Sequence, residues 1–512
     1  MKKSRAEKSA LNAKVNLIFY SIILVVSFYS RKIFLESLGD DFVGLTSTLQ
    51  NILSLLNIAE LGIGAAIGFN LYKPIQENDK EKINELISLF GWLYRYIGLF
   101  ILILGVLVSC FFPLFFSEVN FSYPIIYFAF YSFLASSLIG YFVNYRTLLL
   151  TADQKNYIVF SYHQSANVIK ILFQIGVCYY YKSYYLWILL ELTFGIIESI
   201  ILNIKINKEY KWINTKIKKG SLLNNKYPNI RKSTKQIFVH KLKDFLLSES
   251  DQIFVFVFVS LKMVAYYGNY ILIISKLTVL FDTTLSGVKA SVGNLVAEGD
   301  IKKITSVFWE LMSLRYLIAG ITTVSLFFFI NPFISLWLGH EYLLDNTILI
   351  LLLINTFIIL SRGAVDDFNY AYGHYSDIWS AWTEGAINIC ITLISAPFWG
   401  IPGILLGKII SLIPIIVLWK PYYLFRDGFK LKIRIYWKNT IFYYISFILS
   451  LSIILIIHHF IPISPYLNWF QFFKYLCILI PLYITIYGLI MLSLAPGTGK
   501  LLTRVVKQLK KK

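Results

Sequence analysis

Apolar residues gather along the chain into long unbroken runs. Runs of roughly 20 apolar residues, the length that a helix needs to cross about 30 Å of hydrocarbon, recur from Val15 to Leu494. They lack the alternation of apolar and polar residues that barrel strands show, and a helix satisfies its own backbone hydrogen bonds inside a bilayer. The pattern therefore predicts an all-α polytopic membrane protein.

Fourteen runs are long enough to be transmembrane helices. They cover residues 14–37, 43–70, 84–111, 122–149, 158–180, 185–205, 236–261, 265–293, 307–337, 344–364, 377–398, 401–419, 439–459 and 472–494. The breaks near Pro402 and between the seventh and eighth spans are the least marked in the pattern.

The composition excludes a soluble globular enzyme. Of the 512 residues, 57% are hydrophobic and only 15% are charged. Four cysteines without a regular spacing and six scattered histidines indicate neither a disulfide framework nor a metal site. No phosphate-binding loop is present, and Asp366 and Asp367 stand without the rest of a nucleotide site. We therefore expect no enzymatic activity and no cofactor.

The net charge of +20 is concentrated in connections that would lie on one side of the membrane. Twelve basic residues and one acid lie between Lys205 and Lys243, and six basic residues lie in each of Lys420 to Lys438 and Lys500 to Lys512. Cytoplasmic loops carry the excess of Lys and Arg, so both termini are predicted to be cytoplasmic. This placement explains the charge without nucleic acid. The tail alternates basic residues with apolar pairs, which predicts a surface helix on anionic lipid.

Two parts of the chain resemble each other at an offset close to 221 residues. Asp79, Lys82 and Ile83 match Asp300, Lys303 and Ile304 at 221, and Arg95 matches Arg315 at 220. This offset equals six spans, an even number, which gives two halves of the same orientation, as in the parallel repeats of rocking transporters. We expect an N-lobe at 1–205, a basic cytoplasmic linker at 206–235, a C-lobe at 236–420, two further spans at 421–495 and a basic tail at 496–512.

Ionisable residues within the predicted spans are candidates for function, because a charge at bilayer depth is costly unless it faces a cavity or a partner. The cations are Arg31, Arg95, Arg146, Lys170, Lys276, Lys289, Arg315 and Arg362. The acids considered for coupling or gating are Glu60, Asp251, Asp282, Glu191 and Glu198. A surplus of cations in a central cavity suits an anionic substrate. The alternative for each cation is that its side chain reaches a lipid headgroup. Arg31, Arg146 and Arg362 lie near span ends, whereas Lys170, Lys276 and Lys289 lie deeper, where reaching a headgroup is harder.

Several of these charges also allow a purely structural interpretation. One face of span seven carries Lys241, Asp244, Ser248 and Asp251. These residues form either a gate or cation-coupling site, or an ion pair of Lys241 with Asp244 that is continued by a polar stripe. Asp282 and Lys289 share a face of span eight and could neutralise each other.

Short motifs spread along the chain match those of a known family. They are Arg31, Phe34, Leu38, Gly39, Gly44, Leu45, Glu60, Leu61, Gly62, Leu71, Tyr72, Lys73, Pro74 and Asp79, then His240, Lys241, Leu242, Asp251, Gly268, Asn269 and Tyr270, then Gly400, Ile401, Gly403, Gly407, Ser411, Trp419, Lys420, Pro421, Tyr422 and Tyr423. In these residues the chain resembles the polysaccharide transporters, the Wzx-type flippases of O-antigen and capsule repeat units, which belong to the superfamily of multidrug and oligosaccharide-lipid flippases. The resemblance covers most of the first 425 residues. Lys408 departs from it, since a small residue is usual there.

The resemblance implies two six-helix lobes in a V, with two extra C-terminal helices, in a bacterial cytoplasmic membrane. The implied function is translocation of undecaprenyl-pyrophosphate-linked oligosaccharide to the outer leaflet by alternating access, for O-antigen, capsule or exopolysaccharide synthesis. Arg31 becomes the first choice for a head-group contact, and Asp251 for coupling or gating. Implied partners are membrane lipids, a coupling proton or sodium ion, and the polymerase and glycosyltransferases of the pathway.

Three alternatives stay open at this point. The first is a multidrug or metabolite cation-coupled antiporter of the same fold. The second is a membrane-embedded sugar polymerase or ligase, against which the short predicted outer loops argue, because they leave little room for an acceptor site. The third concerns only the substrate, which could be a lipid-II-type peptidoglycan precursor.

Overall fold

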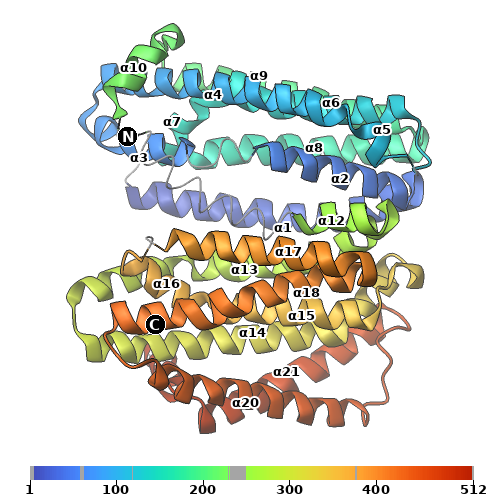
Figure 1. Ribbon diagram of the computed structural model, residues 1–512, viewed down its shortest axis with the longest axis vertical. Helices are drawn as coiled ribbons and strands as arrows, with labels where there is room; N and C mark the ends of the chain where they lie inside the picture. The colour runs from blue at the N-terminus through green and yellow to red at the C-terminus, as the bar shows by residue number, and fades with distance from the viewer. Residues whose placement is uncertain are drawn as a thin grey trace. The chain divides into compact units, whose positions relative to one another are not determined.

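The structure is a computed structural model that describes residues 5–57, 63–117, 119–228, 230, 250–374 and 377–509. All regular secondary structure within these residues is helical (Figure 1). Ten described helices are long and apolar enough to cross a membrane. These observations confirm the prediction of an all-α polytopic membrane protein.

The chain divides into two compact units, Met1–Ala265 and Tyr266–Lys512. The first contains α1 (Arg5–Leu38), α2 (Asp40–Leu56), α3 (Ile63–Glu77), α4 (Lys80–Ser109), α5 (Phe112–Phe115), α6 (Tyr123–Phe142), α7 (Thr147–Ala152), α8 (Asn156–Tyr180), α9 (Tyr184–Glu209), α10 (Gly220–Lys226), α12 (Ser250–Phe258) and the start of α13 (Leu261–Glu298). The second contains the rest of α13, then α14 (Ile301–Trp337), α15 (Asn346–Ser361), α16 (Gly363–Ala371), α17 (Ile378–Trp399), α18 (Ile401–Leu412), α19 (Lys420–Tyr423), α20 (Ile433–His458), α21 (Trp469–Leu494) and α22 (Thr498–Leu509).

Four predicted spans are not among the ten helices that qualify by length and composition. Span two falls on α2 and α3, and span seven on α12, of which only residues from 250 on are described. Span five is α8, which carries His163, Lys170 and Gln174, and span eleven is α17, which buries Glu384. Polar residues and interruptions, which lower the hydropathy of a span, therefore gather in particular helices. Such helices are where membrane transporters place their sites.

The internal repeat begins with the same local structure in both units. Asp79 caps α4 by accepting a hydrogen bond from the Lys82 backbone N–H at 3.0 Å. Asp300 caps α14 by accepting from the N–H groups of Lys302 and Lys303 at 3.0 and 3.2 Å. The residue before each cap has a left-handed backbone, with φ of 54° at Asn78 and 76° at Gly299. The matched sequences thus start two long helices through the same capped turn.

Residues of span seven pack within the first unit. The Asn51 side-chain amide on α2 donates to Gln252 Oε1 on α12 at 2.9 Å. At Gly44, a Cβ atom would lie 2.0 Å from the Leu261 carbonyl oxygen, so only glycine allows this approach of α2 to the start of α13. Lys262 Nζ lies 3.6 Å from Asp40 Oδ2. The predicted lobes group span seven with the later helices instead, and that assignment stays a prediction.

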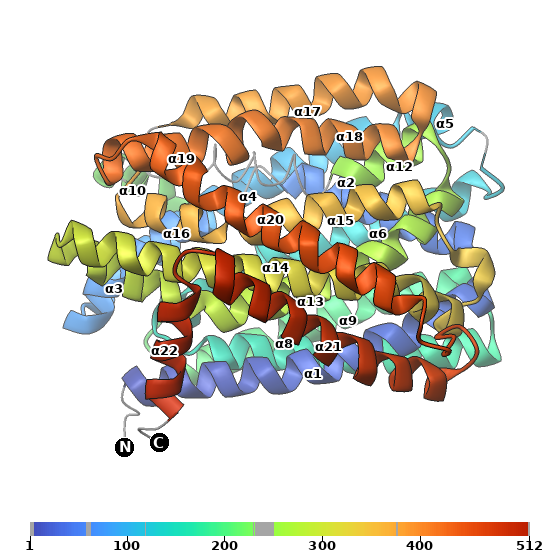
Figure 2. The same cartoon turned by 90° about the horizontal axis from the view of Figure 1, so that it is seen from below.

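The two least marked breaks in the hydrophobic pattern are confirmed. α12 ends at Phe258 and α13 begins at Leu261, while α17 ends at Trp399 and α18 begins at Ile401, next to Pro402. α17 and α18 then run side by side (Figures 1 and 2). The Ser395 hydroxyl donates to the Gly403 carbonyl at 2.8 Å and so holds the two helices together close to the turn.

Candidate functional site

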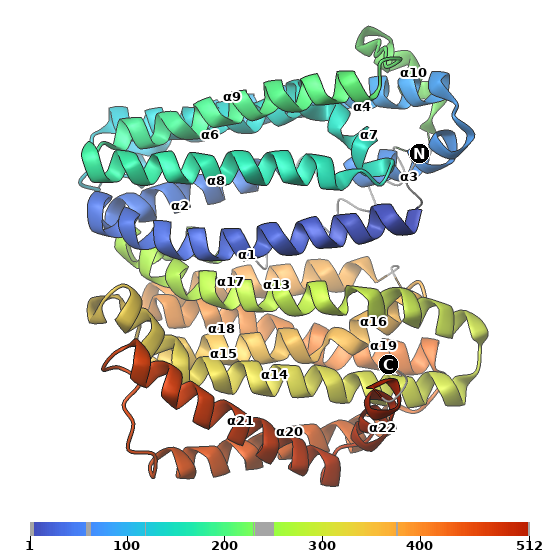
Figure 3. The same cartoon turned by 180° about the vertical axis from the view of Figure 1, so that it is seen from behind.

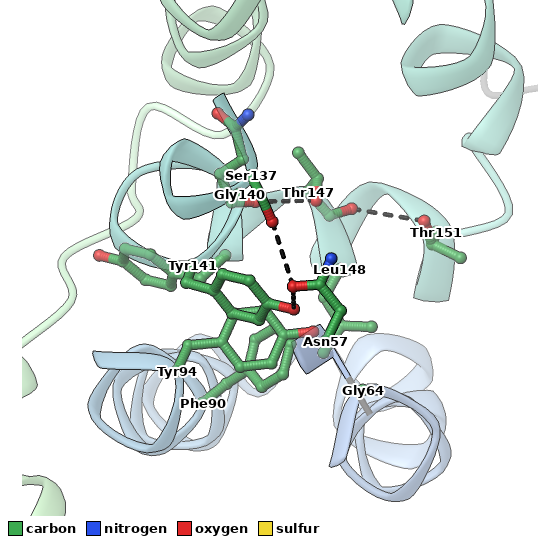
Figure 4. A pocket seen from close by; sticks show the side chains of 12 residues that line it. Asn57, Gly64, Phe90, Tyr94, Ser137, Gly140, Tyr141, Thr147, Leu148 and Thr151 are labelled. Carbon is green, nitrogen blue, oxygen red and sulfur yellow. Dashed lines mark hydrogen bonds between the residues drawn. The ribbon is translucent and has the colours of Figure 1, made fainter. Parts of the chain in front are cut away.

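A polar cavity of about 450 Å³ lies within the first unit, where several helices are interrupted (Figure 4). Its lining comes from the end of α2, from α3, α4 and α6, from the turn between α6 and α7, and from α7 itself. The residues are Asn57, Gly64, Phe90, Tyr94, Ser137, Gly140, Tyr141, Asn144, Tyr145, Thr147, Leu148 and Thr151. A cavity of this size matches the range of small-molecule sites.

Helix ends explain why this cavity is polar. α2 ends at Leu56, and α6 ends at Phe142 and continues as a short 3-10 turn over Asn144–Arg146. The last carbonyl groups of a helix have no partner within the helix, so polar side chains and water gather at such ends. Inside a bilayer, interrupted backbone is tolerated where it lines a protein cavity.

The Asn57 side chain organises one wall of the cavity. Its Oδ1 atom accepts hydrogen bonds from the hydroxyls of Ser137 and Tyr141, both at 3.1 Å (Figure 4). The ring of Tyr141 lies 5.3 Å from that of Tyr94, which in turn lies 3.9 Å from Phe90. Three aromatic rings and one amide are thereby fixed against each other. Their positions are set before any ligand enters.

A second amide of the lining, that of Asn144, is also fixed by hydrogen bonds. Asn144 Oδ1 accepts from Ser199 Oγ at 2.7 Å and from Asn203 Nδ2 at 2.9 Å, both on α9. No charged side chain lines the cavity among the described residues. The cavity therefore offers hydroxyls, amides and aromatic faces, which suit an uncharged polar ligand such as a sugar ring.

Lys170 and the two candidate acids of span six belong to ion pairs between α8 and α9. Lys170 Nζ lies 2.9 Å from Glu191 Oε2, and Gln174 donates to the other oxygen of that carboxylate at 3.0 Å. Glu198 pairs with His163 Nδ1 at 2.8 Å. The structure thus brings Lys170 and Glu191 together, and the positive charge of Lys170 is matched by a carboxylate.

We expect the Lys170 pair to be strongly coupled. Its side chains are only 17% and 16% exposed, whereas His163 is 57% exposed. A double-mutant cycle of Lys170→Met and Glu191→Gln should give a coupling of about 1–3 kcal/mol in thermal unfolding, because each single change leaves a poorly hydrated partner. The same cycle on His163 and Glu198 serves as the exposed control and should give a smaller value. Equal coupling energies for the two pairs would contradict the expectation that burial strengthens the Lys170–Glu191 pair.

The other cations of the first unit have different surroundings. Arg146 donates to the hydroxyls of Tyr145 and Thr215, at 3.2 and 3.1 Å, and to Asn207 Oδ1 at 3.2 Å. The Arg31 guanidinium donates to the Ala265 carbonyl at 3.1 Å. Arg95 is exposed on α4. Arg146 is therefore held by neutral groups directly beside the cavity.

In the second unit the paired carboxylates of α16 each hold an arginine. Arg315 and Asp367 form a buried pair at 3.0 Å, with side chains 8% and 4% exposed. Arg362 and Asp366 form a pair at 3.1 Å, with side chains 29% and 40% exposed. Asp366 and Asp367 thus bind arginine side chains in this structure.

The remaining predicted residues are placed only in part. Lys276 is half-buried on α13, and Asp251 is buried in the first turn of α12. Asp282 and Lys289 lie on α13, but their side chains are outside what the structure describes. Glu60, Lys241 and Asp244 lie outside the described residues.

A search for charged residues misses the lining of the cavity, because that lining is neutral. The signal present in the sequence is different: Asn57 in the middle of span two, and Ser137 and Asn144 in span four, interrupt apolar runs. In transporters, binding sites are marked by neutral polar residues at interrupted helices, and not by charged residues alone.

No protein-family model and no curated protein matches the sequence. Solved structures do share its fold. The lipid II flippase MurJ, in an inward closed conformation, aligns with a TM-score of 0.66 and 16% identity over 92% of this chain and 98% of that one. An inward-facing multidrug resistance MATE family transporter of the MOP superfamily aligns with a TM-score of 0.53 and 13% identity over 82% and 99%. A MOP superfamily transporter from Pyrococcus furiosus aligns with a TM-score of 0.51 and 12% identity over 83% and 97%.

These similarities establish that the chain has the fold of transporters of the MOP superfamily. The aligned structures include a flippase and a multidrug transporter, so proteins that transport different substrates share this fold.

Proposed function

We propose that the protein is a flippase that moves undecaprenyl-pyrophosphate-linked oligosaccharide repeat units from the cytoplasmic to the outer leaflet by alternating access, for surface polysaccharide synthesis. The observation that carries this proposal is the neutral cavity of the first unit, which we assign to the carbohydrate. The lipid tail would stay in the bilayer while the head group crosses.

The chemistry of the cavity favours a carbohydrate over a cationic drug. A sugar ring presents hydroxyls at its edge and C–H groups on its faces. Asn57, Ser137 and Asn144 supply hydrogen-bonding groups for the edge, and the rings of Tyr94 and Tyr141 supply apolar faces with polar tips. A cationic drug would be favoured by a carboxylate, and the described lining contains none.

The pyrophosphate requires cations outside this cavity. Arg31 is our first choice, and the Ala265 carbonyl holds its guanidinium in a defined orientation. A guanidinium can bind two phosphate oxygens through a planar fork of two parallel N–H groups, a geometry that a lysine ammonium lacks. Lys170, Arg315 and Arg362 are matched by carboxylates, so they are weaker candidates for the anionic group.

The proposal is tested by reconstituting the full chain into vesicles that hold one of three labelled compounds. These are a lipid-linked oligosaccharide, lipid II and a cationic dye. Transbilayer movement of the first, measured as access of an impermeant reagent to the sugar, is the expected result. Movement of the dye alone would overturn the proposal in favour of an antiporter, and movement of lipid II alone would redirect it to peptidoglycan precursors.

We expect Arg31→Ala to reduce movement of the oligosaccharide by about a hundredfold, because each lost bidentate contact to a phosphate is worth several kcal/mol in a poorly hydrated site. Arg31→Lys is the control that keeps the charge and should retain part of the activity. If Arg31→Ala moves the lipid at the normal rate while it is inserted in the membrane, Arg31 does not contact the head group.

A further inference from the structure

The C-terminal helix α22 (Thr498–Leu509) has no part in the proposed transport cycle, yet the second unit holds it in a defined place. It follows α21 (Trp469–Leu494) after only three residues, so the chain connection puts it at the membrane surface. α22 runs across the direction of α14, whereas α14, α15 and α21 extend along the bundle (Figures 2 and 3). A helix that follows a span directly and runs across it lies in the plane of the interface.

The turn before α22 is fixed to α14 (Ile301–Trp337) and α20 (Ile433–His458). The Ser313 hydroxyl donates to the Pro496 carbonyl at 2.9 Å, and the Tyr443 hydroxyl donates to the same carbonyl. Gly497 has φ of 85°, and a Cβ atom there would lie 2.4 Å from the Trp309 carbonyl oxygen. Both the backbone conformation and the space therefore require glycine, and the turn has one geometry.

The polar face of α22 is anchored by a buried carboxylate. Arg504 Nε lies 2.9 Å from Glu310 Oε2 on α14, and a second guanidinium nitrogen donates to Oε1 at 3.3 Å. The Glu310 side chain is 6% exposed. One turn earlier, Lys500 Nζ donates to Ser306 Oγ at 3.1 Å. Two basic residues of α22 thus bind α14, which fixes the rotation of the helix about its own axis.

That rotation leaves the apolar face of α22 uncovered. Leu502 and Val506, one turn apart, are 50% and 40% exposed. They lie on the side of the helix opposite Lys500 and Arg504, because 100° per residue separates the two sets. An exposed apolar face at a membrane surface has an available partner, the boundary between headgroups and acyl chains.

The charge of the tail selects the kind of lipid. From Lys500 to Lys512 the sequence has six basic residues and no acid. Of these, Lys500 and Arg504 are engaged with α14. Lys507 is exposed on the same polar side of the helix, about 100° around the axis from Val506, and its long side chain extends toward headgroups beside the apolar face. Basic residues beside a membrane attract anionic headgroups, each by about 1 kcal/mol.

We propose that α22 docks on an anionic phospholipid surface by placing Leu502 and Val506 at the boundary between headgroups and acyl chains, while Lys507 attracts the headgroups from the polar side of the helix. The Arg504–Glu310 pair then fixes the docked helix to α14. The occupant is the lipid headgroup region itself. Docking is then transmitted to the first turns of α14.

The proposal is tested by hydrogen exchange of the full-length protein in nanodiscs of phosphatidylcholine alone and of phosphatidylcholine mixed with phosphatidylglycerol. We expect the amides of α22 to exchange on the order of tenfold more slowly with the anionic lipid. Lys507→Glu, and separately Leu502→Ser with Val506→Ser, should remove that difference. Thr503→Ala, on the polar face of the same helix, is the control and should keep it.

The anchor is tested in the same discs. Arg504→Gln should leave slow exchange in α22 with the anionic lipid but speed exchange around Glu310 on α14, because the helix is no longer fixed there. Equal exchange of α22 in the two lipids would overturn the proposal, and so would a lipid effect that persists in both surface variants. Neither exchange measurement involves transport, so the outcome of this test is independent of the proposed function.

Discussion

Replacing Asp367 by alanine should lower the stability of the folded protein by about 3–5 kcal/mol, which is the cost of leaving a buried charge without its partner. Asp367 and Arg315 are 4% and 8% exposed, and their closest atoms are 3.0 Å apart. Without the carboxylate, the guanidinium loses this ion pair while it stays away from water. The measurement is the midpoint of thermal unfolding of the purified protein in detergent.

The neighbouring residue on the same helix provides a matched control. Asp366 also pairs with an arginine, Arg362, at 3.1 Å, but these side chains are 40% and 29% exposed. Asp366→Ala should therefore cost only about 0.3–0.5 kcal/mol, as for other exposed pairs one helical turn apart. The double variant Arg315→Met with Asp367→Leu should recover much of the loss, since it removes both charges. Similar losses for Asp366→Ala and Asp367→Ala would show that burial does not determine the strength of these pairs.

The Arg315–Asp367 pair also shows what charge patterns in a sequence can and cannot predict. Arg315 was predicted to lie within a span, and it does lie in the middle of α14. Its partner lies 52 residues away on α16, and no local pattern gives that contact. Sequence identifies which residues are costly to bury, but whether a charge meets a carboxylate or a ligand depends on packing between helices.

The helices themselves were predictable because long apolar runs have one stable solution in lipid. The capped turns at Asp79 and Asp300 were also within reach, since a match at a constant offset implies the same local structure. The cavity could not be predicted from the sequence. It forms where the ends of α2 and α6 meet α4, and Asn57, Ser137 and Tyr141 come together only in the folded unit.

Transport should be as sensitive to a change at Asn57 as to the loss of Arg31. We expect Asn57→Leu to reduce movement of a lipid-linked oligosaccharide by about a hundredfold, because it removes the acceptor of two hydroxyls and places an apolar group in a polar cavity. Ser137 and Tyr141 would then lose their orientation as well as their partner. The measurement is the vesicle assay with the sugar exposed to an impermeant reagent.

A pair of tyrosines on α6 separates a role in binding from a role in folding. Tyr141 donates its hydroxyl to Asn57 Oδ1 at 3.1 Å inside the cavity, and Tyr127 donates to the Ser109 carbonyl at 3.1 Å outside it. Tyr141→Phe and Tyr127→Phe each remove one hydroxyl from the same helix, and with it a hydrogen bond of 3.1 Å. Both should therefore cost about 1 kcal/mol of stability.

Only the cavity variant should affect transport. Tyr141→Phe should slow oligosaccharide movement on the order of tenfold, since a hydroxyl that also faces the sugar is worth roughly 1.4 kcal/mol in the transported state. Tyr127→Phe should transport at the rate of the unmodified protein. If both variants slow transport equally, the effect comes from the helix and not from the cavity, and the carbohydrate must bind elsewhere. A change of sugar preference in Tyr141→Phe that is absent in Tyr127→Phe would place a sugar hydroxyl beside Tyr141. Substrates without that hydroxyl make no hydrogen bond to Tyr141, so the variant would not slow their transport.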